Sequence, residues 1–155
     1  MERLNIGIDA ARKKIQHYCA YQERCHSETK SRLYEMGLRS AEVDQLLAEL
    51  VQENFLSEER FAYAFAGGKF RMKHWGRVKI KYELKKRLVS EYCIRKGLTG
   101  IDEDEYMEVL KQEAGKRARS LAGNISRKRS TLTRYLLQKG FEQNLVNDVV
   151  KERFP

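Results

Sequence analysis

The amino-acid sequence predicts an all-α protein, built as an elongated tandem array of three three-helix repeats. Three observations support this prediction. Apolar residues recur at helical spacing, as in Val43, Leu46, Leu47 and Leu50, and no run of alternating β-branched residues suggests a strand. The only proline among the 155 residues is the last one, so the body of the chain lacks that helix breaker. One sequence pattern also returns after 103 residues, which indicates an internal repeat.

Start and stop signals divide the chain into nine expected helices. In order, these helices span residues 9–24, 27–36, 40–53, 57–73, 75–88, 90–98, 102–122, 126–139 and 142–153. Most are preceded by a side chain that can accept a hydrogen bond from the first turn, namely Ser27, Ser40, Ser57, Ser90, Asp102 and Ser126. Asp102 and Glu105 have the spacing of a capping box. Gly37 and Gly140 follow leucine-bearing segments, where a left-handed residue can end a helix.

Those two glycines mark the internal repeat. Residues 33–38 resemble residues 136–141, and a middle copy fits at a shift of 51 residues, with Leu88 in the place of the glycine. We therefore expect a single chain with three units, at residues 1–53, 54–100 and 101–155. Because a lone three-helix unit buries little apolar surface, neighbouring units should stack into a modular shape. A compact bundle with accidental self-similarity is the alternative.

The formal net charge of +9 is distributed unevenly. Residues 1–68 hold 9 basic and 11 acidic residues, whereas residues 69–155 hold 22 basic and 11 acidic residues. The positive excess of the second part predicts an anionic partner, such as nucleic acid or an acidic protein surface. A basic protein without such a partner is the plainer alternative.

The sequence also predicts a compartment. No stretch approaches the ~18 apolar residues of a membrane span, and the chain opens without a basic and then apolar leader. We therefore expect a cytoplasmic protein that binds no membrane. Three cysteines at irregular spacing, Cys19, Cys25 and Cys93, are expected to be free thiols in this reducing environment.

Signals for catalysis or metal binding are weak. On a helix, His17 and Cys19 point roughly 200° apart, so they do not converge on one metal with Cys25 and His26. The segment 67–69, Gly-Gly-Lys, lacks the earlier glycine, the Ser or Thr and the preceding strand of a phosphate-binding loop, so we expect a helix break or kink there. We expect no enzyme activity, metal or cofactor; an enzyme with an unrecognised site is the contrary hypothesis.

Two stretches concentrate positive charge. From residue 69 to 87, nine basic residues stand against only Glu83, and from 114 to 141 there is no acidic residue. Rows of cations suit phosphate contacts, and interleaved aromatic rings can stack on bases. We nevertheless expect Trp75 and Tyr82 to lie in the core, with Trp75 as the anchor of the middle repeat.

Helical spacing also assigns Val78 or Ile80, together with Leu84, to the core side of the first stretch. This leaves a set of cations for electrostatic contact, namely Arg77, Lys81, Lys85, Lys86, Arg127, Lys128 and Arg129. The prediction is salt-sensitive binding to single- and double-stranded DNA with little sequence preference. Cationic faces that are merely solvated are the alternative.

Segments along much of the chain resemble one bacterial family. The sequences NFLSEERFA at 54–62 and WGRVKIKYEL at 75–84 are similar to the signature of the RecX family, whose members regulate the RecA recombinase. The closing LLQKGF at 136–141, followed by residues 146–150, resembles the last helical pair of the family. The likeness extends from about residue 10 to 153 and is strongest over 54–84.

The resemblance implies both a fold and a role. It implies tandem three-helix repeats without catalytic activity, which bind the RecA nucleoprotein filament along its helical groove. Such proteins limit filament growth, ATP hydrolysis and strand exchange, and thereby tune recombination, DNA repair and the SOS response. No residue is assigned to a site by the resemblance. A stand-alone basic helical protein that binds nucleic acid without a recombinase partner is the alternative function.

Overall fold

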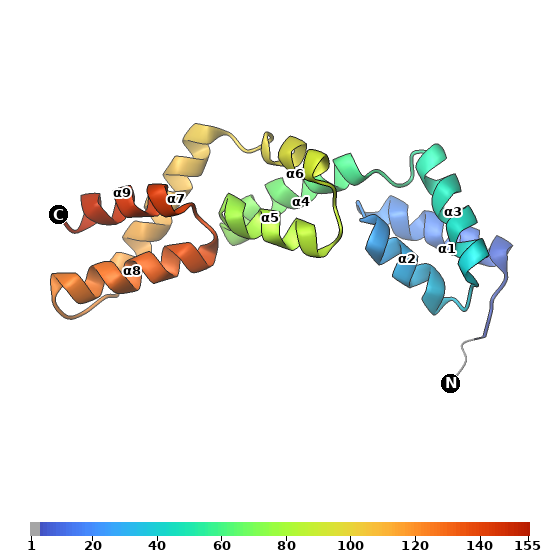
Figure 1. The fold of residues 1–155 in the computed structure, drawn as a ribbon, viewed down its shortest axis with the longest axis horizontal. Helices are drawn as coiled ribbons and strands as arrows, with labels where there is room; N and C mark the ends of the chain where they lie inside the picture. The colour runs from blue at the N-terminus through green and yellow to red at the C-terminus, as the bar shows by residue number, and fades with distance from the viewer. Residues whose placement is uncertain (1–3) are drawn as a thin grey trace.

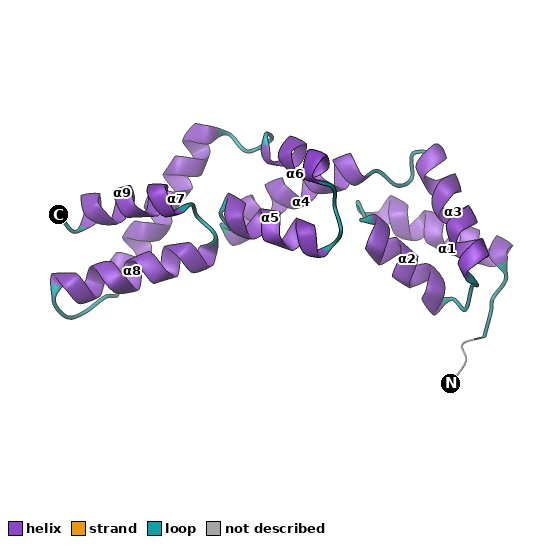
Figure 2. Ribbon diagram, viewed as in Figure 1, coloured by secondary structure: helices purple, strands orange, loops and turns teal. Residues whose placement is uncertain are grey.

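The computed structural model describes residues 4–155, and all regular structure in that range is helical (Figure 2). The nine helices found there are α1 (Ile8–Tyr21), α2 (His26–Glu35), α3 (Ser40–Gln52), α4 (Glu58–Lys73), α5 (Arg77–Lys86), α6 (Glu91–Leu98), α7 (Glu103–Ala118), α8 (Ile125–Lys139) and α9 (Gln143–Arg153). The groups α1–α3, α4–α6 and α7–α9 follow one another along the long axis of an elongated molecule (Figure 1). We refer to α1–α3, α4–α6 and α7–α9 as repeats 1, 2 and 3. The predicted all-α repeat fold is confirmed.

The capping predictions are confirmed for three helices and wrong for three others. Ser57, Ser90 and Asp102 each accept a hydrogen bond from the amide three residues later, as predicted. The other three expected caps lie inside their helices, because Cys25, Arg39 and Asn124 are the residues that precede α2, α3 and α8. Asn124 Oδ1 accepts from the Arg127 amide at 2.8 Å, so the asparagine takes the role expected of Ser126.

The turn after each middle helix keeps one backbone conformation in all three repeats. Gly37, Leu88 and Gly140 have φ angles of 83°, 62° and 98°. Leucine therefore adopts the left-handed conformation that glycine adopts in the other two repeats, at a cost in backbone strain.

The glycine pair in α4 does not break the helix. We expected a break or kink at 67–69, but α4 is continuous from Glu58 to Lys73. Gly67 is buried, and the Arg71 guanidinium lies where a β-carbon on Gly67 would project, 2.9 Å from its position. The pair is accommodated because the helix continues on both sides and is anchored by its buried residues Phe61, Ala66 and Phe70.

Two hydrophobic cores lie along the molecule. The core of repeat 1 comprises nine buried residues, including Leu33, Leu46 and Leu50. A larger core of nineteen buried residues runs through repeats 2 and 3 without interruption, and one of the nineteen is Cys25, the residue before α2 in repeat 1. Neighbouring units thus share apolar surface fully at one junction and slightly at the other. Ile80 and Leu84 belong to the larger core, as predicted.

The prediction for the aromatic residues of α5 and its entry is partly wrong. Tyr82 is 62% exposed, so it does not belong to the core, and Val78 is exposed as well. Trp75 is half-buried and packs against the larger core. The Nζ atoms of Lys79 and Lys69 lie 4.5 and 5.1 Å from the centroid of its ring.

The middle helices of the repeats meet head to tail along the long axis (Figure 1). At the start of α5, the Gly76 and Val78 amides donate to the Lys139 and Gly140 carbonyls at the end of α8, at 2.8 and 2.9 Å. At the other end of α5, the Ser27 hydroxyl near the start of α2 donates to the Arg87 carbonyl at 3.0 Å. Because α8, α5 and α2 contact one another at their ends, the sides of α5 and α8 are not covered by these contacts.

Candidate nucleic-acid interface

The predicted cations on α5 differ in how far their charge is already compensated. Lys81 Nζ lies 3.2 Å from Glu91 Oε1, and Lys85 Nζ lies 3.8 Å from Glu91 Oε2, at the start of α6. The hydrogen bond from Lys81 lowers the pKa of the Glu91 carboxyl. Lys86 makes no ion pair within the described residues and lies with its Nζ 5.7 Å from the Tyr82 ring centroid. The free charge of this surface is therefore greatest at Lys86.

Arg77 is engaged between repeats 2 and 3. Its guanidinium donates to Glu103 at 3.0 Å, lies 3.4 Å from Glu142 and sits 3.8 Å from the centroid of the Tyr106 ring. The buried Tyr106 hydroxyl in turn donates to Glu142 and accepts from the Arg77 amide. Arg77 is thus an intramolecular tie, and any contact that it makes with DNA competes with two carboxylates.

The predicted cations on α8 have no carboxylate partner in the described part of the chain. Arg127, Lys128 and Arg129 occupy its first two turns, and none of them forms an ion pair among the described residues. Arg129 Nε donates to the Phe154 carbonyl at 2.7 Å, and Lys128 Nζ lies 6.0 Å from the Phe154 ring. The turn between α7 and α8 that brings them together lies at the end of the molecule remote from repeat 1 (Figure 1).

Further cations extend this surface along the end of α7. They are Lys116, Arg117 and Arg119, and no carboxylate within the described residues pairs with them. The structure therefore divides the seven predicted binding residues into two separate groups, one on α5 and one on α8. The α8 group carries the less compensated charge.

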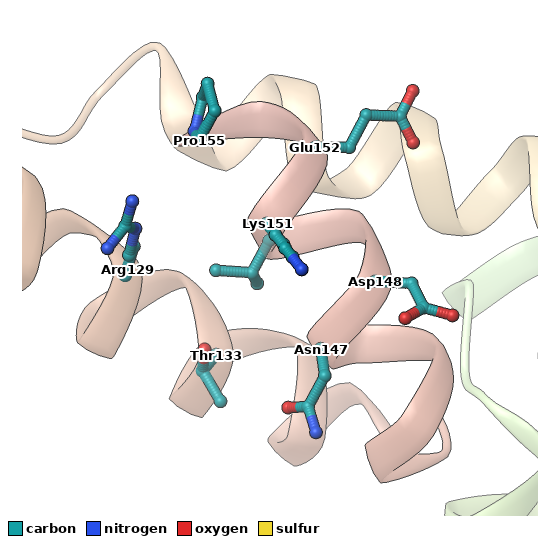
Figure 3. Close-up of a pocket in the computed structure, with 8 residues that line it drawn as sticks. Arg129, Thr133, Asn147, Asp148, Lys151, Glu152 and Pro155 are labelled. Carbon is teal, nitrogen blue, oxygen red and sulfur yellow. The ribbon is translucent and has the colours of Figure 1, made fainter.

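A groove between α8 and α9 adjoins Arg129 (Figure 3). It has a volume of about 740 Å³ and is lined by residues that include Thr133, Asn147 and Lys151. Figure 3 shows the carboxylates of Asp148 and Glu152 pointing away from Arg129. Charges of both signs thus surround the groove, which makes it less suited to a polyanion than the end of the molecule beside it.

A buried carboxylate ties repeat 2 to repeat 3 beneath these surfaces. Glu113 on α7 is 5% exposed, lies 2.5 Å from His74 Nδ1 and accepts a 2.8 Å hydrogen bond from the Tyr135 hydroxyl. Burial alone would raise the pKa of Glu113, but the hydrogen bonds from His74 and Tyr135 outweigh it and lower the pKa. Burial and the bond to Glu113 raise the pKa of Tyr135 to about 12.

The histidines and cysteines do not form a metal site in the part of the chain that the structure describes. Cys19 and Cys25 are buried, and burial raises the pKa of both thiols. His17 and His26 are exposed on different helices.

Sequence reasoning missed two features. Tyr82 is exposed beside Lys86 although it was expected in the core. Repeat 1 carries a basic and aromatic groove that includes Lys13, Lys14 and Tyr21. The four-residue spacing of residues 13, 17 and 21 indicates that these side chains share one helix face. The net charge of this part of the chain does not indicate a basic groove, because nearby acidic residues offset the basic ones.

Comparison with known proteins identifies two of the repeats. The family model described as the second three-helix domain of RecX matches residues 57–98, and that of the third three-helix domain matches residues 103–150. Together they match more than half of the chain. Their order agrees with that of repeats 2 and 3.

Several named relatives match over most of this chain. The regulatory protein RecX of Chlorobaculum tepidum is 27% identical over 125 residues, which make up 81% of this chain and 76% of that protein. RecX of Clostridium botulinum strain Alaska E43 is 29% identical over 83% of this chain and 61% of its own length. For Halalkalibacterium halodurans RecX the identity is 28%, and the chain spans half of that protein.

Solved structures share the fold. The crystal structure of RecX from Lactobacillus salivarius matches with a TM-score of 0.83 at 18% identity, over 94% of this chain and 95% of that one. A second crystal structure of a regulatory protein RecX matches with a TM-score of 0.82 at 21% identity, over 94% and 71% of the two chains. With two RecX domain models matched in order and this fold in common, the chain belongs to the RecX family of regulatory proteins.

Proposed function

We propose that this chain is a non-enzymatic regulator that binds the RecA–DNA filament along its groove. It inhibits filament extension, ATP hydrolysis and strand exchange by RecA, and so tunes recombination, DNA repair and the SOS response. The observation that carries the proposal is the match to the second and third RecX domains over residues 57–98 and 103–150. The sequence resemblance to regulators of RecA supplies the partner.

The shape and charge of the molecule support this role. Three repeats follow one another along the long axis (Figure 1). The candidate cations lie in two separate groups, on α5 in repeat 2 and on α8 in repeat 3. Weak contacts that are linked in one molecule add through effective concentration, so no single contact needs to be strong. The cations proposed to face DNA or the filament are Arg77, Lys81, Lys85, Lys86, Arg127, Lys128 and Arg129.

The direct test is the ATPase activity of RecA on single-stranded DNA, measured with and without the purified chain. We expect concentration-dependent inhibition that weakens as salt is added, because screening weakens contacts between exposed charges. Unchanged RecA turnover at saturating protein would contradict the proposal.

Charge reversal tests the two surfaces separately. We expect the triple change of Lys81, Lys85 and Lys86 to Glu to weaken inhibition. Changing Arg127 and Lys128 to Glu should weaken it more, because no carboxylate of residues 4–155 offsets their charge. A matched control reverses exposed cations outside both surfaces, Lys30, Arg39 and Lys111. Circular dichroism checks that each variant folds. If the triple α5 variant inhibits as well as the parent chain does, α5 is not a contact surface.

A stand-alone nucleic-acid-binding protein is the second candidate function. The observation that favours it is the positive charge at the α7–α8 end of the molecule, which no carboxylate among the described residues pairs with. Such a protein would bind DNA with the same affinity whether or not RecA is present. It would leave the rate of ATP hydrolysis by RecA unchanged when DNA is in excess over both proteins. The two measurements together separate the candidates.

A further inference from the structure

A groove on repeat 1 combines positive charge with aromatic rings. It lies between α1, α2 and the segment that connects them, and it has a volume of about 540 Å³. Its lining residues are Lys13, Lys14, His17, Tyr18, Tyr21, Arg24, Arg32 and Met36. Neither family model covers this part of the chain.

The spacing of α1 gathers these side chains on one face of the helix. Lys13, His17 and Tyr21 follow one another at intervals of four residues, and Tyr18 follows Lys14 at the same interval. Tyr21 is the last residue of α1 and is 78% exposed, which leaves its ring open to a ligand. On the opposite side of the groove, Arg32 of α2 and Met36, which follows α2, are also four residues apart.

The two tyrosines differ in what covers them. The Arg24 guanidinium lies 3.8 Å from the Tyr18 ring centroid, and its Nε donates to the Tyr18 carbonyl at 3.1 Å. The Arg32 guanidinium lies 5.6 Å from the same ring. Tyr18 therefore holds the arginines in place, and Tyr21 is the ring without such a cover.

The positive charge of the groove is segregated from the acidic residues of the same repeat. Residues 4–53 hold seven basic and eight acidic residues, yet the described lining contains no Asp or Glu. Of the nearby carboxylates, Glu35 pairs with Arg32 at 3.3 Å, and Glu28 accepts from the Cys25 amide and thiol at the start of α2. Lys13 and Lys14 form no ion pair among the described residues.

We propose that this groove binds a short stretch of single-stranded nucleic acid. Tyr21 stacks on one unpaired base, and Lys13 and Lys14, which form no ion pair among the described residues, contact the phosphates on either side of it. An exposed ring set among cations fits a base joined to phosphates, because the base offers a face for stacking and the backbone offers the charge. An acidic peptide satisfies only the cations. The proposal requires no recombinase, so it stands independently of the proposed function.

Photo-crosslinking locates the strand directly. The full chain is irradiated with an oligothymidylate of about 12 nucleotides that carries 5-iodouracil, a length within the usual range for strand-binding sites. We expect a crosslink to Tyr21 or Tyr18 in the peptides mapped by mass spectrometry. Crosslinks confined to residues beyond 57 would overturn the proposal, whether or not the chain affects RecA.

Substitutions at Tyr21 test the stacking. Tyr21→Ala should weaken binding of the same oligonucleotide, without RecA, by about ten-fold, because loss of one stacked base is worth that much. Tyr21→Phe should bind as the parent chain does, since it keeps the ring. Tyr92→Ala removes a similarly exposed ring in repeat 2 and serves as the control. Equal affinity of the Tyr21→Ala and Tyr21→Phe variants would contradict the stacking.

Substitutions at the lysines test the charge. The double change of Lys13 and Lys14 to Ala should lower the slope of log affinity against log salt by about 1.4, at about 0.7 for each phosphate lost. The same change at Lys30 and Arg39, which are exposed in repeat 1 outside the groove, should leave the slope unchanged. Polyglutamate of equal charge should compete poorly with the oligonucleotide for the parent chain. Equal competition that is lost with the Lys13 and Lys14 changes but kept in Tyr21→Ala would show an acidic-peptide site and overturn the assignment.

Discussion

Leu88 adopts a left-handed backbone conformation that is more favourable for glycine. Its φ angle of 62° matches that of the glycines at the equivalent turns, and its side chain is 79% exposed. A left-handed conformation costs a residue with a β-carbon about 1–2 kcal/mol. The exposed side chain recovers little of this through packing.

We therefore predict that Leu88→Gly stabilises the protein. Relief of the strain is partly offset by the larger conformational entropy of glycine in the unfolded chain, about 0.4–1 kcal/mol, so the net gain should be about 0.5–1 kcal/mol. Urea denaturation followed by circular dichroism measures it. Leu88→Ala, which keeps the β-carbon, is the control and should give no gain. A loss of stability in the glycine variant would mean that Leu88 packs in a way its exposure does not indicate.

Glu113 predicts how stability depends on pH. Its pKa lies below the ordinary value of 4.5 in the folded protein, so its contribution is fully present above that value and is lost as pH falls through the folded pKa. Lys139 adds to this lowering of the pKa. We expect the parent chain to exceed Glu113→Gln in stability by about 1–3 kcal/mol at pH 7, as for a buried group that loses its partners. Urea midpoints of both chains, measured from pH 7 to pH 3, should converge below pH 4.5. A gap that is constant across this range would rule out the carboxylate as its source.

At the element scale, the row of middle helices depends on close approach of backbones. Gly76 at the start of α5 touches Gly140 at the end of α8, so that a β-carbon on Gly76 would collide with the Gly140 carbonyl. The two amide-to-carbonyl bonds of this junction require that approach. Gly68 in α4 offers the opposite case, because nothing lies within 4 Å of its β-carbon position.

The two glycines should therefore respond oppositely to alanine. Gly68→Ala should stabilise the protein by about 0.5–1 kcal/mol through helix propensity alone. Gly76→Ala should destabilise it and separate α5 from α8, because the neighbouring atoms are backbone atoms that cannot move aside. Hydrogen exchange at the Val78 amide, compared between the parent chain and the Gly76→Ala variant, reports the loss of the bond to Gly140. Unaltered protection of Val78 in that variant would mean that the junction adapts.

The sequence predicts the helices better than it predicts which face of each helix is buried. The spacing of leucines and glycines gives the nine helices and their grouping because every repeat carries the same pattern. For α5 the apolar residues alternate, at Val78, Ile80, Tyr82 and Leu84, so helical spacing admits two buried faces. The structure buries Ile80 and Leu84 and exposes the other two. That choice is set by the packing of α4 and α6 against α5, which no local pattern encodes.

The candidate binding residues follow the same rule. Runs of cations at 69–87 and 114–141 are visible in the sequence, but their partners across the fold are not. Arg77 meets Glu142 because the turn between α8 and α9 lies against the start of α5. The groove of repeat 1 is not predicted from the sequence, because only the fold brings its basic residues together and the net charge of this repeat is close to zero.

At the scale of the whole molecule, the two cores divide the chain unequally. Repeats 2 and 3 contribute eighteen of the nineteen buried residues of the larger core, and the Tyr106 ring packs between Phe70 and Phe141 at centroid distances of 5.7 and 5.4 Å. The smaller core has nine buried residues, eight from repeat 1 and Leu56 from the connection between α3 and α4. Among the described residues, repeat 1 adds only Cys25 to the buried residues of the larger core. Polar links add the Arg60–Glu23 pair at 3.0 Å. The junction between repeats 1 and 2 is therefore the weaker one.

We predict that the chain unfolds in two steps, with repeat 1 first. Hydrogen exchange in increasing urea should show protection lost over Ile8–Gln52 before it is lost over Glu58–Arg153, because the smaller core supplies less burial. Two matched core variants sharpen the test, since each should cost about 2–5 kcal/mol. Leu46→Ala should lower protection in repeat 1 alone, whereas Leu136→Ala should lower it in repeats 2 and 3 together. The prediction is wrong if the parent chain and both variants each lose protection at a single urea concentration over their whole length. The chain would then unfold as one cooperative unit, with repeat 1 firmly joined to repeat 2. A repeat 1 that moves on the rest of the molecule can place its own groove on a strand independently of the surfaces on α5 and α8.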